Sequence, residues 1–190
     1  LYFNSGNSGG CRPKCLWHDR EGAWLVKFRH TYDPKDIGRM EYKYNEVARK
    51  CGINVPDYKL LDGKYFASKR FDIENGKRLH IATAGALLNE SISNPKLDYK
   101  VLLHLTGYLT QDSQQVDEMF QRMVFNVLTD NKDDHVKNFS FICREGKWSL
   151  APAYDLTLCK EGYHGEHATS ANNKGNPDIE DMLAVGESIR

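Results

Sequence analysis

The chain has 190 residues, 40% of them hydrophobic, and its 26 Lys and Arg residues balance its 26 Asp and Glu residues. This length and composition exclude a disordered chain and a small disulfide scaffold, and they allow one large domain or two small lobes with a core. The even charge balance argues against nucleic-acid binding as the main role of the chain.

The sequence predicts a soluble cytoplasmic protein. No apolar run is long enough to span a bilayer, and the N-terminus lacks the basic and apolar regions of a secretory signal. Five cysteines, an odd number, favour reduced thiols over a disulfide framework. Cys11, Cys15 and His18 resemble half of a zinc site, but no second ligand pair follows, so we expect no metal there. His164 and His167 lie in a glycine-rich loop, where we expect solvated histidines.

The first elements expected along the chain are a glycine-rich segment at residues 5–10 and two strands, at residues 15–18 and 23–28. The glycine-rich segment is either a flexible linker or a loop whose amides hold phosphates. Lys27 lies in the otherwise apolar second strand. It is either a charge on the solvated face of that strand or a cation that reaches nucleotide phosphates.

A helix is expected next, with Asp33 as its N-cap and Gly52 as its stop. Glu41 and Glu46 both lie on this helix. Because five positions separate them, they point in different directions, and at most one can face Lys27. We favour Glu41.

After a predicted hairpin at residues 58–71, with Asp62-Gly63 as its turn, helical patterns dominate. One apolar stripe runs from Leu97 through Val101 to Leu105, and a stronger one, begun near Asp112 or Ser113, reaches Leu128. This order predicts an α+β fold with a small β-rich lobe at residues 1–72 and a mainly helical lobe at residues 73–190. A nucleotide cleft is expected between the lobes.

The densest chemical pattern follows the second helix. Asp133 and Asn138 precede a predicted hairpin formed by residues 139–142 and 148–150, and Asp155 comes after it. Because a hairpin returns the chain to its starting point, Asn138 and Asp155 are expected at the same end, where their oxygens could hold Mg²⁺ against nucleotide phosphates. A catalytic Asp with two metal ligands is the arrangement of kinase-type phosphoryl transfer. The alternative is an acidic loop without a catalytic role.

Several motifs occur here in one order: Gly9 to Lys14, Val26-Lys27-Phe28, Arg70-Phe71-Asp72, the motif from Asp133 to Asn138, and Pro152 to Leu156. Together they resemble the HipA family of serine/threonine protein kinases, the toxins of bacterial toxin–antitoxin systems. The resemblance runs from about residue 5 to the C-terminus. It implies a two-lobed protein-kinase-like fold that uses ATP and magnesium.

The resemblance also implies roles for individual residues. Asp133 matches the catalytic Asp, Asn138 and Asp155 match the metal ligands, Lys27 matches the phosphate-contacting lysine, and Phe71 lies near the matching hinge. We expect Glu41 to pair with Lys27.

The glycine-rich loop of the family corresponds to residues 8–14, including Gly9 and Gly10. Members of the family can be silenced by autophosphorylation of a serine in this loop. We therefore expect Ser8, with Ser5 as second choice, to be a regulatory phosphosite.

The resemblance implies a protein substrate, such as an aminoacyl-tRNA synthetase, and a helix-turn-helix antitoxin that carries any contact with operator DNA. His135 and Lys137 would organise the catalytic loop or meet the γ-phosphate. Full-length relatives have a further N-terminal subdomain, and we expect the helical lobe to be incomplete at its C-terminus. Two alternatives are an inert nucleotide-binding module acting through an antitoxin partner, and a small-molecule or lipid kinase.

Overall fold

The structure, a computed structural model, describes residues 12–93 and 95–189. Ser5, Ser8, Gly9, Gly10 and Cys11 therefore lie outside the described residues. The elements are β1 (Lys14–Asp19), β2 (Gly22–Lys27), α1 (Ile37–Lys50), β3 (Tyr58–Leu61), β4 (Tyr65–Lys69), β5 (Ile73–Glu74), β6 (Lys77–Arg78), β7 (His80–Thr83), α2 (Ala84–Leu88), α3 (Tyr99–Thr110), α4 (Ser113–Leu128), β8 (Ser140–Arg144), β9 (Lys147–Leu150) and α5 (Ile179–Glu187).

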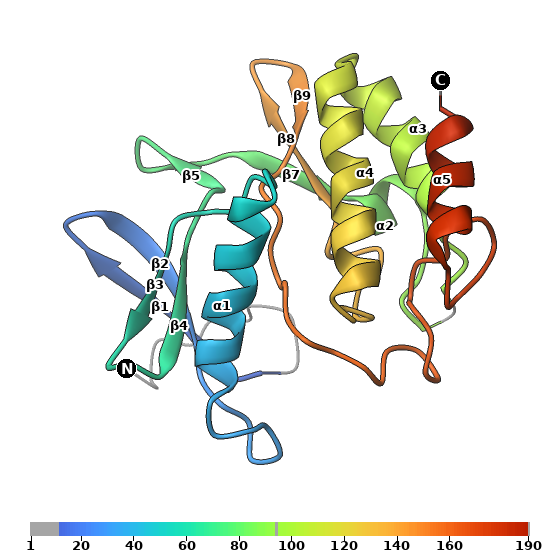
Figure 1. Cartoon of the computed structure of the whole chain (residues 1–190). Helices are drawn as coiled ribbons and strands as arrows, with labels where there is room; N and C mark the ends of the chain where they lie inside the picture. The colour runs from blue at the N-terminus through green and yellow to red at the C-terminus, as the bar shows by residue number, and fades with distance from the viewer. Residues whose placement is uncertain (1–11, 94, 190) are drawn as a thin grey trace.

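The N-lobe consists of an antiparallel sheet of order β1-β2-β4-β3 and helix α1, which contacts β3 and β4 (Figure 1). Asp62 and Gly63 both have positive φ angles, 49° and 64°, as the expected two-residue turn requires. Alternation along β2 buries Trp24 and Val26 against Cys15 and Ala67. The expected strands and hairpin of this lobe are confirmed.

The start of α1 differs from the expectation. The helix begins at Ile37, with Asp36 at the N-cap position, so Asp33 as N-cap was wrong. The Asp33 carboxylate instead accepts a hydrogen bond from the His30 amide at 2.8 Å, which closes a turn before the helix. The expected stop is confirmed, because Gly52 follows the helix with a φ of 83°.

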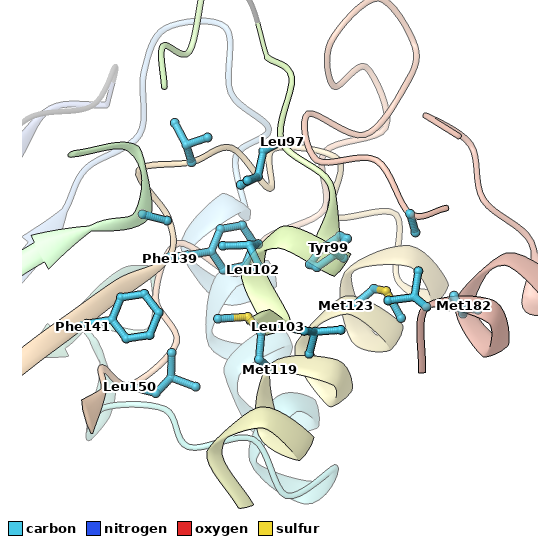
Figure 2. Close-up of a cluster of buried hydrophobic side chains, with 14 residues drawn as sticks. Leu97, Tyr99, Leu102, Leu103, Met119, Met123, Phe139, Phe141, Leu150 and Met182 are labelled. Carbon is cyan, nitrogen blue, oxygen red and sulfur yellow. The ribbon is translucent and has the colours of Figure 1, made fainter. Parts of the chain in front are cut away.

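The C-lobe contains the β7-β8-β9 sheet and helices α2 to α5. Its core lies where α3, α4 and the sheet meet, and Figure 2 shows Tyr99, Leu102 and Met119 among the packed side chains. The hairpin expected between Asn138 and Asp155 is present as β8 and β9. Val101 on α3 and Leu128 at the end of α4 were wrongly placed on apolar faces, because these residues are 43% and 66% exposed.

An apolar cluster joins the two lobes. Residues from α1 and the following segment pack against α4 and the chain after β9; the cluster comprises Ala48, Ile53, Val55, Phe125, Ala153 and Leu156. The Tyr44 hydroxyl donates to the carbonyl of Thr129 at 2.6 Å, and the Ala153 amide donates to the carbonyl of Asn54 at 2.8 Å. These contacts hold α1 and the segment after it against the C-lobe. The predicted domain boundary after residue 72 stays a prediction.

Candidate active site

A cavity of about 500 Å³ lies between the lobes. Leu16 and Leu25, from neighbouring strands of the first sheet, and Phe71, from the connection between the lobes, form part of an apolar wall. Lys27 and Asp155 line the same cavity. An apolar wall with a few charged groups is typical of sites for nucleotide-sized ligands.

Lys27 joins the two lobes at this cavity. Its ammonium group donates hydrogen bonds to the carboxylates of Glu41, on α1, and Asp155, from the C-lobe. Glu46 instead pairs with Lys50 at 3.4 Å on the exposed side of the helix. The choice of Glu41 as the partner of Lys27 is therefore confirmed.

The charges of this triad depend on one another. Burial by itself would lower the pKa of Lys27, but the carboxylates of Glu41 and Asp155 outweigh it and raise the pKa above its ordinary value. The positive charge of Lys27 lowers the pKa of Asp155. Burial raises the pKa of Glu41, although Lys27 opposes that effect. Asp155 is therefore ionised at neutral pH, as a ligand for a hard cation must be.

Asp133 lies in the loop between α4 and β8, and its side chain is 53% exposed. Partial desolvation raises the pKa of its carboxyl group; the nearby positive charge of His135 lowers it, and the charges of Asp155 and Asp134 raise it. His135 Nε2 lies 3.8 Å from Asp133 Oδ1. Lys137 is exposed, and its carbonyl accepts a hydrogen bond from the Tyr154 hydroxyl. Asp133 is thus accessible to an acceptor hydroxyl.

Asn138 and Asp155 line one small cavity, as the hairpin predicts. Asn138 Nδ2 donates to the carbonyl of Asp133 at 2.7 Å, which leaves its amide oxygen available as a ligand. Asp155 adopts a left-handed φ of 55°, a conformation uncommon for residues other than glycine. An amide oxygen and a carboxylate fit Mg²⁺ when phosphate oxygens complete its shell. Within the described ranges, no cluster of three or more His, Cys, Asp or Glu side chains could hold a metal.

Phe71 lies where the chain passes from one lobe to the other. Its ring stacks on the ring of Tyr154, with 5.6 Å between the centroids. Arg70 and Asp72, on either side, form an ion pair that fixes the backbone of this connection. The position of Phe71 at the cavity wall agrees with its expected place near a hinge, and its contact with a nucleotide stays a prediction.

A buried network behind the loop was missed. Asp134 is fully buried and accepts hydrogen bonds from the Tyr99 hydroxyl at 2.7 Å and the Ala168 amide at 2.9 Å. His167 Nδ1 lies 2.9 Å from its carboxylate. His164 is exposed as expected, but His167 is buried, so its interpretation as a solvated loop histidine was wrong. The network ties the loop of Asp133 to the segment after Asp155.

Comparisons with known proteins place this geometry in context. A family model for the HipA-like C-terminal domain matches residues 6–189. A Sinorhizobium fredii protein named as a candidate kinase, Y4dM, is 27% identical in an alignment of 169 positions that covers 80% of this chain. The structure resembles Shewanella oneidensis HipA, solved with HipB and operator DNA, with a TM-score of 0.78 and 20% identity over 98% of this chain. It also resembles the Helicobacter pylori proinflammatory kinase CtkA, with a TM-score of 0.61 and 18% identity over 78% of this chain.

These relatives are longer than the chain, which spans 41% of Y4dM, 53% of the HipA chain and 55% of the CtkA chain. The two solved structures support the expected kinase-like fold with a β-rich and a helical part. In the part of the chain that the structure describes, no helix is long and apolar enough to cross a membrane.

Proposed function

The chain belongs to the HipA-like C-terminal domain family, and from this premise we propose that it is an ATP-dependent serine/threonine protein kinase. One observation carries the proposal: Lys27 binds both Glu41 and Asp155 at the wall of the cavity between the lobes. A lysine held by a helix carboxylate beside a metal-binding Asp is the arrangement that positions ATP phosphates in protein kinases.

In the proposed mechanism, Asp133 accepts or orients the hydroxyl proton of the substrate. Lys27 holds the α- and β-phosphates, and Glu41 keeps its ammonium group in place. Once phosphates are present, Lys27 exchanges its contact with Asp155 for phosphate oxygens, which frees that carboxylate. His135, whose Nε2 lies 3.8 Å from Asp133, would steady the catalytic carboxylate, and Lys137 would organise the loop or meet the γ-phosphate.

Asn138 and Asp155 are the residues that would hold Mg²⁺, which supplies neutralisation of phosphate charge when bound. Their side chains offer hard oxygen donors in one cavity. The adenine base would lie against the apolar wall near Phe71, Leu16 and Leu25. Backbone groups of residues 70–72, which line the cavity, would pair with its ring edge.

The proposed substrate is a protein serine or threonine, and an aminoacyl-tRNA synthetase is the class that the family resemblance suggests. The chain would also phosphorylate itself at Ser8, with Ser5 as second choice, both outside the described residues. Shewanella HipA was solved with HipB and operator DNA. By analogy we propose a helix-turn-helix antitoxin as partner, with DNA contacted only through it.

Substitution Asp133→Ala tests the catalytic assignment. We expect transfer of labelled phosphate from ATP to the chain itself and to a candidate synthetase to fall by at least about 100-fold, since general-base catalysis contributes roughly that much. The affinity for ATP, measured by calorimetry, should change little. Asp117→Ala, at an exposed position on α4, is the matched control and should keep full transfer. Retained transfer in Asp133→Ala would remove Asp133 from the mechanism.

The same assay separates the alternatives. ATP binding by wild-type protein without transfer to itself, to synthetases or to small acceptors would indicate an inert nucleotide-binding module. Transfer to a small molecule or a lipid, with none to protein, would indicate the other kinase class. Mass spectrometry after incubation with ATP tests Ser8 and Ser5: modification of neither serine in active enzyme would contradict the proposed phosphosites.

A further inference from the structure

A second cavity, of about 350 Å³, lies in the N-lobe beside the first turn of α1. Its walls come from the end of β2, the start of α1 and the beginning of β4. Cationic side chains dominate the lining: Arg12, Lys27, Arg29, Lys35 and Lys64. Among the lining residues the only carboxylate belongs to Glu41. Lys27 and Glu41 also take part in the function proposed above, whereas Arg29, Lys35 and Lys64 have no role in it.

Two of the five cations are neutralised by carboxylates. Arg12 Nε lies 3.0 Å from Asp33 Oδ2, and Lys27 is bound to Glu41. Because Glu41 already binds Lys27, the cavity has no free carboxylate among its lining residues.

The other three cations have no acidic partner within 4.0 Å among the described residues. Arg29 donates only to the carbonyl of Asp33, at 3.5 Å, and the Lys64 ammonium lies 4.8 Å from the ring centre of Tyr65. Lys35 is exposed at the edge of the cavity. Like charges that converge on one hollow repel one another, and an anion of two negative charges removes that repulsion.

The aromatic residues in the lining favour an anion that is attached to a small apolar group. Phe28 and Tyr65, whose ring centroids lie 5.3 Å apart, form part of its wall. Such rings can contact a short apolar carrier while the cations hold the charged end. A phosphate monoester has both parts, with a charge near −2 and three acceptor oxygens at neutral pH.

The second cavity is distinct from the proposed nucleotide site. Lys27 belongs to both linings, whereas Phe71 and Asp155 line only the first cavity, and Lys35 and Lys64 line only the second. Lys35 precedes α1 and Lys64 lies on the β3–β4 connection. An anion bound by both lysines would therefore bridge the start of α1 and the sheet, next to Glu41.

We propose that this cavity is a second anion site, which binds a phosphate monoester, either as a free small molecule or as a phosphorylated serine or threonine side chain. The proposal concerns binding alone and holds whether or not the chain is a kinase.

The test measures binding of three probes, namely inorganic phosphate, phosphoserine and a short phosphoserine peptide, with the first cavity saturated by a non-hydrolysable ATP analogue. We expect the double substitution Lys35→Ala and Lys64→Ala to weaken binding by about tenfold or more, because charge-assisted contacts are lost. The control, Lys43→Ala with Lys77→Ala, removes the same charge from exposed positions outside the cavity and should bind like wild type.

Each outcome of this titration either supports or overturns the proposed anion site. Phosphoserine or its peptide binding more tightly than inorganic phosphate supports the site and identifies a carried phosphate as its ligand; equal affinities support the site with free phosphate as ligand. The proposal is overturned if no probe binds, if the nucleotide analogue displaces the probes, or if the control weakens binding as much as the double substitution. Circular dichroism spectra of the variants verify that the exposed lysines are not needed for folding.

Discussion

The ionisation of Asp133 is governed by residues that do not react. Partial desolvation and the charges of Asp155 and Asp134 raise its pKa, whereas the charges of His135 and Arg12 lower it. Because a catalytic carboxylate must be ionised to take a proton, activity should be lost as pH falls through this raised pKa. The acid limb of the rate profile therefore lies above the value of about 3.9 for an isolated Asp.

Substitution His135→Ala should move that limb to higher pH, because it removes a positive charge that lowers the pKa of Asp133. The measurement is the pH dependence of kcat/KM for phosphate transfer. His104→Ala, at an exposed position on α3, serves as control and should leave the limb in place. A limb that stays fixed in His135→Ala would show that the charge of His135 does not act on Asp133.

The buried Asp134 makes a second prediction at this scale. Removing His167 leaves a fully buried carboxylate without one of its partners, and losing one partner of a buried pair costs about 3 kcal/mol. His167→Ala should therefore lower the free energy of unfolding by roughly that amount in urea titrations. His164→Ala, in the same segment but exposed, should change it by less than about 0.5 kcal/mol. Equal effects would mean that the network does not stabilise the fold.

At the scale of elements, the placement of α1 decides where Glu41 points. Gly38 lies in the first turn of this helix, and a Cβ added there would lie 2.0 Å from the carbonyl oxygen of Lys64. Backbone cannot yield as a flexible side chain does, so Gly38→Ala must push α1 away from the sheet. Overpacking of this kind costs about 1–3 kcal/mol.

We expect Gly38→Ala to weaken ATP binding as well as stability, because Glu41 moves with the helix and releases Lys27. Calorimetry and thermal unfolding measure the two effects. Gly107→Ala on α3 is a matched control: its added Cβ meets only a side-chain methyl of Val116, at 3.4 Å. It should be neutral or stabilising by up to about 1 kcal/mol, since Ala favours helix over Gly. Unchanged ATP affinity in Gly38→Ala would contradict the coupling.

Local sequence signals predicted turns and strands better than features that depend on contacts with the rest of the chain. The Asp62-Gly63 turn was predictable because it needs positive φ angles. The start of α1 was not, because the Asp33 carboxylate satisfies the His30 amide in a preceding turn. His167 could not be placed from sequence, because it lies in a long irregular segment without periodicity and its burial depends on Asp134, 33 positions away.

At the scale of the whole molecule, the site exists because the two lobes hold a fixed relation. The contacts of Lys27 depend on it, since Asp155 lies 128 positions further along the chain. Spacing alone could not bring these two residues together; the ordered set of motifs predicted that they share one site, but not that they contact each other directly. The apolar cluster between α1 and α4 is what maintains this relation.

Phe125 is the largest side chain of that cluster contributed by α4; it is 5% exposed and meets the Tyr44 ring at a centroid distance of 6.2 Å. Phe125→Ala should cost about 3–5 kcal/mol, the usual range for deleting a buried aromatic ring. Because the cavity left behind loosens α1 against α4, the affinity for ATP should fall as well. The free energy of unfolding and the ATP dissociation constant are the two readouts.

Leu128→Ala provides the control on the same helix, because Leu128 is 66% exposed and its truncation should cost less than about 0.5 kcal/mol. If Phe125→Ala lowers stability while ATP affinity stays at the wild-type value, the cluster supports the fold without setting the cleft. If stability and ATP affinity fall together and Leu128→Ala changes neither, the contact between the lobes sets the ATP affinity of the cleft without touching the ligand.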